Sequence, residues 1–218
     1  PYLSRGLGDV YKRQVSNMFN HSKIQISDET NYLKVFQHTD VGMITLRLDL
    51  ENQVLKRKLR HALGISMPSV RQIEATTDAL LGWMSPDELL YFCMKSEVVN
   101  RLNLVKDTMT SYHSLSLDVS DARVVFSLEG GKVREVIAKL APIDTAINSL
   151  ELGEIRRTRL SQVAAAIWLT EENRATIICF RSVEKYLRDL LLISCKKGSE
   201  VGVWSVSYTH LTLPTKCW

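Results

Sequence analysis

Hydrophobic and polar positions follow two different periods in the first half of the chain, which predicts strands and helices in alternation. Residues 42–50 are apolar and β-rich, and residues 51–63 place apolar side chains on one helical face that ends before Gly64. The same criteria predict strands at 68–78, 80–84, 88–94 and 114–119, and a helix at 98–109 capped by Ser96. Apart from the strand and turn at 68–78, this order is β-α-β-β-α-β, so residues 40–119 are expected to form a ferredoxin-like subdomain.

The second half mixes the same elements with different lengths. A strand at 123–128 is followed by a glycine break and by a helix at 133–140. An antiparallel pair at 158–169 and 175–180 and a last helix at 182–193 complete it, with Val183, Tyr186, Leu187, Leu190 and Leu191 as the buried helical stripe. Residues 120–205 are therefore expected to be a second α+β subdomain, with largely antiparallel sheet, packed on the first. Residues 15–39 are polar and unpatterned, which predicts a loose N-terminal arm.

Both ends of the chain resemble translated sequencing adaptor. The strings DVYKRQ (9–14) and VSYTH (206–210) can be encoded by one DNA element read in opposite directions, the transposase end used in library preparation. We therefore expect residues 1–14 and 206–218 to be non-native and exclude them from fold reasoning. The alternative is a basic N-terminal arm with a β-prone C-terminal tail.

Removing these ends changes the charge. The formal net charge of +4 falls to +1, because four basic residues (Arg5, Lys12, Arg13, Lys216) leave with one acid, Asp9. The remaining chain gives no electrostatic reason to expect nucleic-acid binding.

The cysteines outside the adaptor ends are an odd set without a metal or redox spacing. Cys93, Cys179 and Cys195 include no C-x-x-C pair, which favours buried thiols in a reducing, cytoplasmic compartment. We expect no signal peptide, and because no apolar run is long enough to cross a bilayer we expect no membrane association. The histidines are scattered, and Gly130 and Gly131 lack the spacing of a phosphate-binding loop.

Two polar clusters are the candidate sites. In the first, Asp118, Asp121 and Arg123 lie at a strand boundary, where an internal ion pair or an Asx-type turn between the two halves is favoured over a functional role. In the second, Arg156, Arg157 and Arg159 with Thr158 could bind a phosphate or the glutamyl tail of folate. Strand alternation would separate them onto two faces, which favours a polar subunit contact or a solvated surface.

Three further residues are candidates for structure or assembly. Trp83 and Trp168 stand in apolar runs, and the run at 163–169 is equally suited to a core strand and to a subunit interface. Arg181 flanks the start of the last helix.

Many short segments occur in the order found in one protein family. They are GMITLRLDL from Gly42, GWMSPDELL from Gly82, LDVSDARVVFSLEG from Leu117, LAPID from Leu140, GEIRRTRLSQVAAAIWLT from Gly153, CFRSVEKYL from Cys179 and GSEVGVW from Gly198. With these segments the chain resembles the gamma subunit of heterotetrameric sarcosine oxidase, although residues 91–94 and 106–116 depart from the family pattern. The resemblance implies a fold similar to the folate-binding domain of the glycine-cleavage aminomethyltransferase.

The resemblance also implies a role in assembly. A gamma subunit would be non-catalytic and would stabilise a complex with alpha, beta and delta subunits that oxidises sarcosine to glycine. FAD, FMN, NAD, tetrahydrofolate and zinc would be bound by those partners and none by this chain. The alternative is a free-standing folate-binding protein or folate-dependent enzyme on the same fold, for which the chain is short.

Overall fold

The fold is described for residues 22–202 of a computed structural model, so the two proposed adaptor ends lie outside the described residues. The first half contains β3 (Val41–Leu48), α2 (Gln53–Leu63), β4 (Ile73–Ala75), β5 (Leu80–Ser85), β6 (Glu88–Met94), η1 (Lys95–Glu97), α3 (Val98–Met109) and β7 (Ser114–Asp118). The other half contains β1 (Lys23–Gln25), β2 (Lys34–His38), β8 (Arg123–Glu129), α4 (Val133–Leu140), β9 (Arg156–Leu160), β10 (Val163–Glu171), β11 (Arg174–Phe180), η2 (Arg181–Val183) and α5 (Glu184–Ser194).

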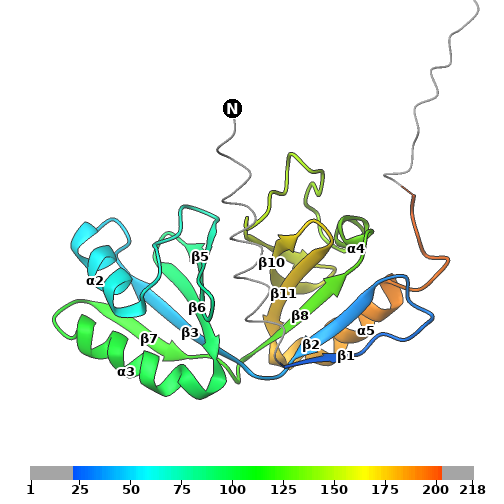
Figure 1. Ribbon diagram of the computed structural model, residues 1–218. Coiled ribbons are helices and arrows are strands. Elements are labelled where there is room, and N and C mark those ends of the chain that lie inside the picture. The colour runs from blue at the N-terminus through cyan, green and yellow to red at the C-terminus, as the bar shows by residue number, and fades with distance from the viewer. Residues whose placement is uncertain (1–21, 203–218) are drawn as a thin grey trace, which may run out of the picture.

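The predicted ferredoxin-like order of the first half is confirmed. Its described strands form a five-stranded antiparallel sheet in the order β4-β5-β6-β3-β7, with α2 and α3 packed on the outer face (Figure 1). Helix α2 ends at Leu63 and is capped by Gly64, whose φ of 67° lies in the left-handed region that glycine tolerates. The expected cap of α3 is wrong, because Ser96 lies inside the 3-10 turn η1 and the N-cap is Glu97 without a side-chain bond.

The expectation of a loose arm is wrong for its described part. Strands β1 and β2 add to the second sheet, whose order among the described residues is β1-β2-β8-β11-β10-β9. The short segment KVFQH supplies Val35 to the helix-side core, while Phe36 and His38 are buried as well. This burial holds the segment in place despite its polar surroundings in the sequence.

A second difference concerns the predicted strand at 158–169. It is a hairpin of β9 and β10, because Ser161 adopts a φ of 54° and reverses the chain. A non-glycine residue at positive φ is uncommon, and the apolar pattern alone gave no sign of this turn.

The two halves repeat one topology. The series β3-α2-β4-β5-β6-α3-β7 of the first half corresponds to β8-α4-β9-β10-β11-α5 in the second, with the same strand order in each sheet. In the first half, β7 pairs with the first strand, β3. In the second half, the equivalent position beside β8 is occupied by β2, which precedes the first half in the sequence. The second half is therefore a circularly permuted version of the first.

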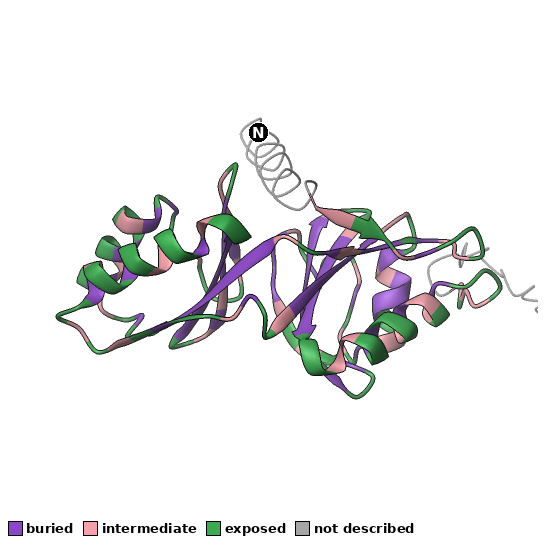
Figure 2. Ribbon diagram, turned by 90° about the horizontal axis from the view of Figure 1, so that it is seen from below, coloured by how far each residue is buried: buried purple, intermediate pink, exposed green. Residues whose placement is uncertain are grey.

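Each half has a helix-side core, and a third core joins the halves. Across the inner faces of the two sheets, Phe92 of β6 contacts Trp168 of β10 with ring centroids 5.8 Å apart. Other members of this inter-sheet core are Val41, Met43, Ile73, Leu80, Met84, Leu90, Val125, Ile155, Ala166 and Ile178. Figure 2 shows the buried strands in the middle of the molecule and the exposed faces of the helices outside.

Candidate functional site

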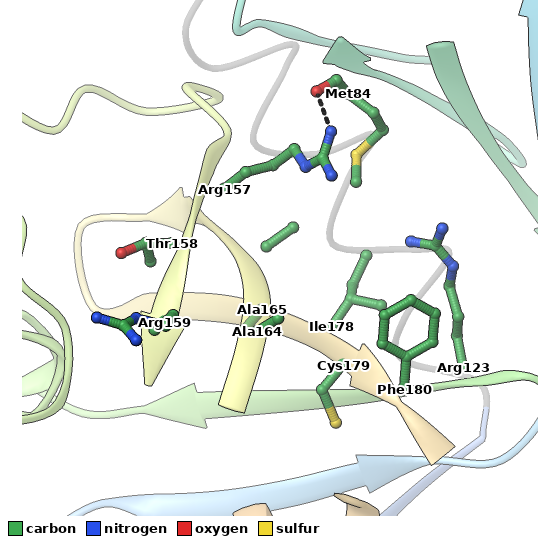
Figure 3. A pocket seen from close by; sticks show the side chains of 11 residues that line it. Met84, Arg123, Arg157, Thr158, Arg159, Ala164, Ala165, Ile178, Cys179 and Phe180 are labelled. Carbon is green, nitrogen blue, oxygen red and sulfur yellow. Dashed lines mark hydrogen bonds between the residues drawn. The ribbon is translucent and has the colours of Figure 1, made fainter. Parts of the chain in front are cut away.

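A cavity of about 500 Å³ opens beside the inter-sheet core. It is lined by Met84 of β5, by Arg123 of β8, and by residues of the three strands β9, β10 and β11: Arg157, Thr158, Arg159, Ala164, Ala165, Ala166, Ile178, Cys179 and Phe180. In Figure 3, the guanidinium groups of Arg157 and Arg123 project from opposite sides toward Met84, above Ile178 and Phe180. The side chain of Arg159 points away from these two.

One buried carboxylate, Glu88 at the start of β6, lies among three guanidinium groups. Its carboxylate oxygens are 3.7 Å from Arg123, 3.8 Å from Arg47 and 4.0 Å from Arg157. These contacts are longer than hydrogen bonds. One negative charge is therefore shared by three positive charges, and the region keeps a positive surplus.

The two cavity arginines differ in burial. The Arg123 side chain is only 16% exposed and lies 5.4 Å from the centre of the Phe180 ring, its cross-strand neighbour. Burial lowers the pKa of Arg123 from its ordinary value, while the charge of Glu88 acts in the opposite direction. Arg157 is 55% exposed and donates one hydrogen bond, from Nη1 to the carbonyl oxygen of Met84 at 3.0 Å.

Strand alternation separates the arginine cluster. Arg157 and Arg159 pair with Ala166 and Ala164 on the inner face of the sheet. Arg156 belongs to the other face, where its guanidinium contacts Glu154 at 2.8 Å and the carbonyl oxygen of Ser149 at 2.8 Å. Thr158 alternates with the inner-face arginines and pairs with Ala165. The structure therefore places only Arg157 and Arg159 on the inner face, together with Arg123 from another strand.

The Asp118–Arg123 segment crosses between the halves. Asp118 Oδ1 accepts hydrogen bonds from the backbone N–H of Ser120 at 2.9 Å and from its hydroxyl at 2.6 Å, which is an Asx-type turn. The Ser120 hydroxyl oxygen in turn accepts from the N–H of Met43 at 2.9 Å. Asp121 forms an ion pair with Lys95 at 2.8 Å.

Arg181 holds the same crossing from the second half. Its Nε donates to the carbonyl oxygen of Asp121 at 2.7 Å and its Nη2 to that of Arg123 at 3.0 Å. Arg181 thus connects the start of the last helix with the crossing segment and holds the backbone of Arg123.

The aromatic candidates have three different environments. Trp168 is fully buried in the inter-sheet core, so the apolar run of β10 is a core strand. Trp83 is half-buried against the helix-side core of the first half. Tyr186 was expected in a buried stripe but is 49% exposed. The buried positions of α5 are Leu187 and Leu191.

Sequence reasoning missed Glu88 and Phe180 as members of this region. Glu88 follows Pro86 and Asp87, a composition that indicates a turn. The strand pattern could have located Glu88, because Glu88, Leu90 and Phe92 occupy alternate positions of one apolar strand and therefore share one face of the sheet. A charged residue in such a position needs a buried partner.

Residues 22–202 contain no group of three or more His, Cys, Asp or Glu side chains placed to hold a metal ion. In the same range, no helix combines the length and apolar character needed to span a membrane.

The three buried thiols are expected to be chemically inert. Burial raises the pKa of Cys93, Cys179 and Cys195 to about 12, so almost no thiolate is present at pH 8. In a Cys217→Ser variant, we expect native protein to react with a disulfide reagent at least about 100-fold more slowly than denatured protein. Because the pKa of these thiols is higher in the folded than in the unfolded protein, their ionisation should not change the free energy of unfolding below about pH 8.5. It should lower that free energy as the pH rises toward about 12. The absorbance of the thiolate that the reagent releases measures the reaction rate. A native protein that reacts as fast as the denatured protein would contradict the burial of the three thiols.

The fold and the cavity define an α+β protein of two ferredoxin-like halves that present a cationic cavity between their sheets. Residues 47–195 match the family described as sarcosine oxidase, gamma subunit. The chain belongs to the sarcosine oxidase gamma subunit family. No curated protein sequence matches the chain.

Two solved structures show a similar fold. One is a chain of the heterotetrameric sarcosine oxidase from Corynebacterium sp. U-96, in complex with pyrrole 2-carboxylate, with a TM-score of 0.72 and 19% identity over 79% of this chain and 88% of that one. The other is the glycine cleavage system aminomethyltransferase T from Bartonella henselae, with a TM-score of 0.55 and 12% identity over 74% of this chain and 46% of that one. These likenesses bear out the expected α+β fold of the folate-binding-domain type.

Proposed function

We propose that this chain is a non-catalytic gamma subunit that stabilises a heterotetrameric sarcosine oxidase, the flavoprotein complex that converts sarcosine to glycine. The observation that carries the proposal is the family match over residues 47–195, which includes both halves of the fold. The partners are the alpha, beta and delta subunits, which bind FAD, FMN, NAD, tetrahydrofolate and zinc.

The chemistry of the cavity supports a binding role. Its charged lining consists of guanidinium groups, which stay protonated near neutral pH and act as hydrogen-bond donors. Such groups bind anions and position carboxylates, but they do not accept a proton from a substrate at that pH. The cavity therefore suits recognition better than acid–base catalysis.

Co-expression with partner subunits tests the proposal. The full chain, carrying an affinity tag, is produced with alpha, beta and delta subunits of a related sarcosine oxidase and purified through the tag. We expect a yellow complex with flavin absorbance and sarcosine-dependent oxygen uptake. A colourless protein without partners would contradict the proposal, and tight tetrahydrofolate binding by that protein would favour the free-standing folate-binding alternative.

A further inference from the structure

The cavity between the sheets contains arginine donors that the described part of the protein leaves largely unused. A guanidinium group carries five N–H donors. Arg157 directs one hydrogen bond to Met84, and the contact of Arg123 with Glu88 is 3.7 Å, beyond hydrogen-bond length. Within residues 22–202, Arg159 has no ion-pair or hydrogen-bond partner. The cavity thus presents donors and positive charge to whatever enters it.

The region has more positive than negative charge. Glu88 is the one carboxylate within ion-pair distance of Arg123 and Arg157 among the described residues, and Arg47 competes for it. Asp87 lies 3.9 Å from Arg47 on the exposed turn. At the other end of the cavity is Arg159, a further cation without an ion-pair partner among residues 22–202. A ligand that carries carboxylates would supply the missing negative charge.

The apolar part of the lining indicates a protein ligand. Phe180 is 53% exposed beside Arg123, Ala164 is exposed as well, and the buried side chains of Met84 and Ile178 line the cavity. Arginine, aromatic and methionine side chains are the types enriched in the buried centres of protein interfaces. An exposed phenylalanine would lose contact with water when a partner chain covers it.

We propose that this cavity is the docking site for an acidic, partly apolar segment of a partner subunit. One carboxylate of the segment lies between Arg123 and Arg157, a second pairs with Arg159, and an apolar side chain covers Phe180. This inference rests on the proposed function, because it assigns the surface by which the gamma subunit binds its complex. Arg181 and the crossing segment fix the backbone of Arg123, and the Arg123 side chain is largely buried, so this part of the site is ordered before the partner binds.

Charge substitution tests the site in the assembled enzyme. The full chain is compared with an Arg157→Gln/Arg159→Glu variant and with Phe180→Ala in binding to the alpha–beta–delta assembly of a related oxidase, measured by titration at low and high salt. We expect at least about 100-fold weaker binding for the double variant and about 10-fold for Phe180→Ala. The salt dependence of binding should decrease in the double variant only.

Two variants serve as controls. Lys34→Glu/Arg188→Glu changes exposed charges of the same half outside the cavity and should bind within about 3-fold of the original chain. Arg157→Lys/Arg159→Lys keeps the charge and should retain part of the affinity that the Gln/Glu variant loses. Two results would overturn the inference. One is unchanged binding by both the Arg157→Gln/Arg159→Glu and the Phe180→Ala variants. The other is a loss of affinity in the Lys34→Glu/Arg188→Glu control equal to that of the Arg157→Gln/Arg159→Glu variant.

A peptide probe separates failure of the site from failure of the proposed function. If the original chain does not bind the subunit assembly, the proposed function fails, and a fluorescent Gly-Glu-Leu-Glu-Gly peptide is then titrated against it by polarisation. Binding that the Arg157→Gln/Arg159→Glu variant abolishes would support the acidic docking site by itself. Absence of peptide binding up to millimolar concentration would overturn it, and competition by free glutarate with no effect of Phe180→Ala would indicate a small carboxylate ligand instead.

Discussion

Replacing Trp168 with alanine is expected to lower the free energy of unfolding by about 3–5 kcal/mol, the range seen when a buried tryptophan or phenylalanine is truncated. Trp168 is fully buried and contacts Phe92 across the boundary between the two sheets. The substitution removes contacts from both halves and leaves a cavity that the rigid strands around it fill only in part. Urea denaturation followed by circular dichroism measures the loss.

Trp83→Ala is the matched control for this prediction. Trp83 is half-buried at the rim of one helix-side core, so its truncation should cost about 1–2 kcal/mol. Equal losses of unfolding free energy in the two variants would show that the inter-sheet core contributes no more to stability than the periphery of one half.

The second large effect is expected for Glu88→Gln, at about 2–4 kcal/mol of destabilisation. The amide keeps the shape of the carboxylate but removes the charge next to Arg123, whose side chain is only 16% exposed. A buried charge without its partner is strongly unfavourable. Because the cavity is open to water, the expected loss of unfolding free energy is smaller than the loss for a fully buried ion pair.

The exposed neighbour Asp87 provides a control, since Asp87→Asn should change stability by less than about 0.5 kcal/mol. A double variant, Glu88→Gln with Arg123→Gln, removes both charges and should be more stable than Glu88→Gln alone. If Glu88→Gln unfolds at the same urea concentration as the original chain, the carboxylate does not compensate Arg123.

The first half of the fold could be predicted well because local signals agree there. Residues 51–63 have a clean helical period and are followed by Gly64, and this glycine is the C-cap of α2. The turn at 85–87 likewise separates β5 from β6 as its composition predicts. Where sequence pattern and tertiary packing give the same answer, the elements can be located from sequence alone.

The second half departed from prediction where distant contacts decide the structure. The β2 segment KVFQH is too short and polar to stand out, and its place in the sheet depends on pairing with β8, far along the chain. Tyr186 fits the helical period, but α5 lies on its sheet so that Leu187 and Leu191 take the buried positions. A periodic pattern gives the face of a helix only to within about one residue.

The candidate site was accessible from sequence only in part. Strand alternation correctly separated Arg157 and Arg159 from Arg156, because this property is local. The meeting of Arg157 with Arg123 and Glu88 depends on the packing of two sheets, which no local pattern encodes.

The permuted second half has a consequence for the order in which the protein folds during synthesis. Strand β2 is made before the whole first half, yet its hydrogen-bonding partner β8 is made after it, as the pairing of Phe36 with Ser127 shows. The five-stranded half can therefore complete its sheet while β2 still lacks β8 and can pair only with the short strand β1. Long-range strand pairing is slow, and an unpaired strand can associate with other chains. During synthesis the chain therefore passes through a partly folded intermediate in which β1 and β2 precede their partner strand β8.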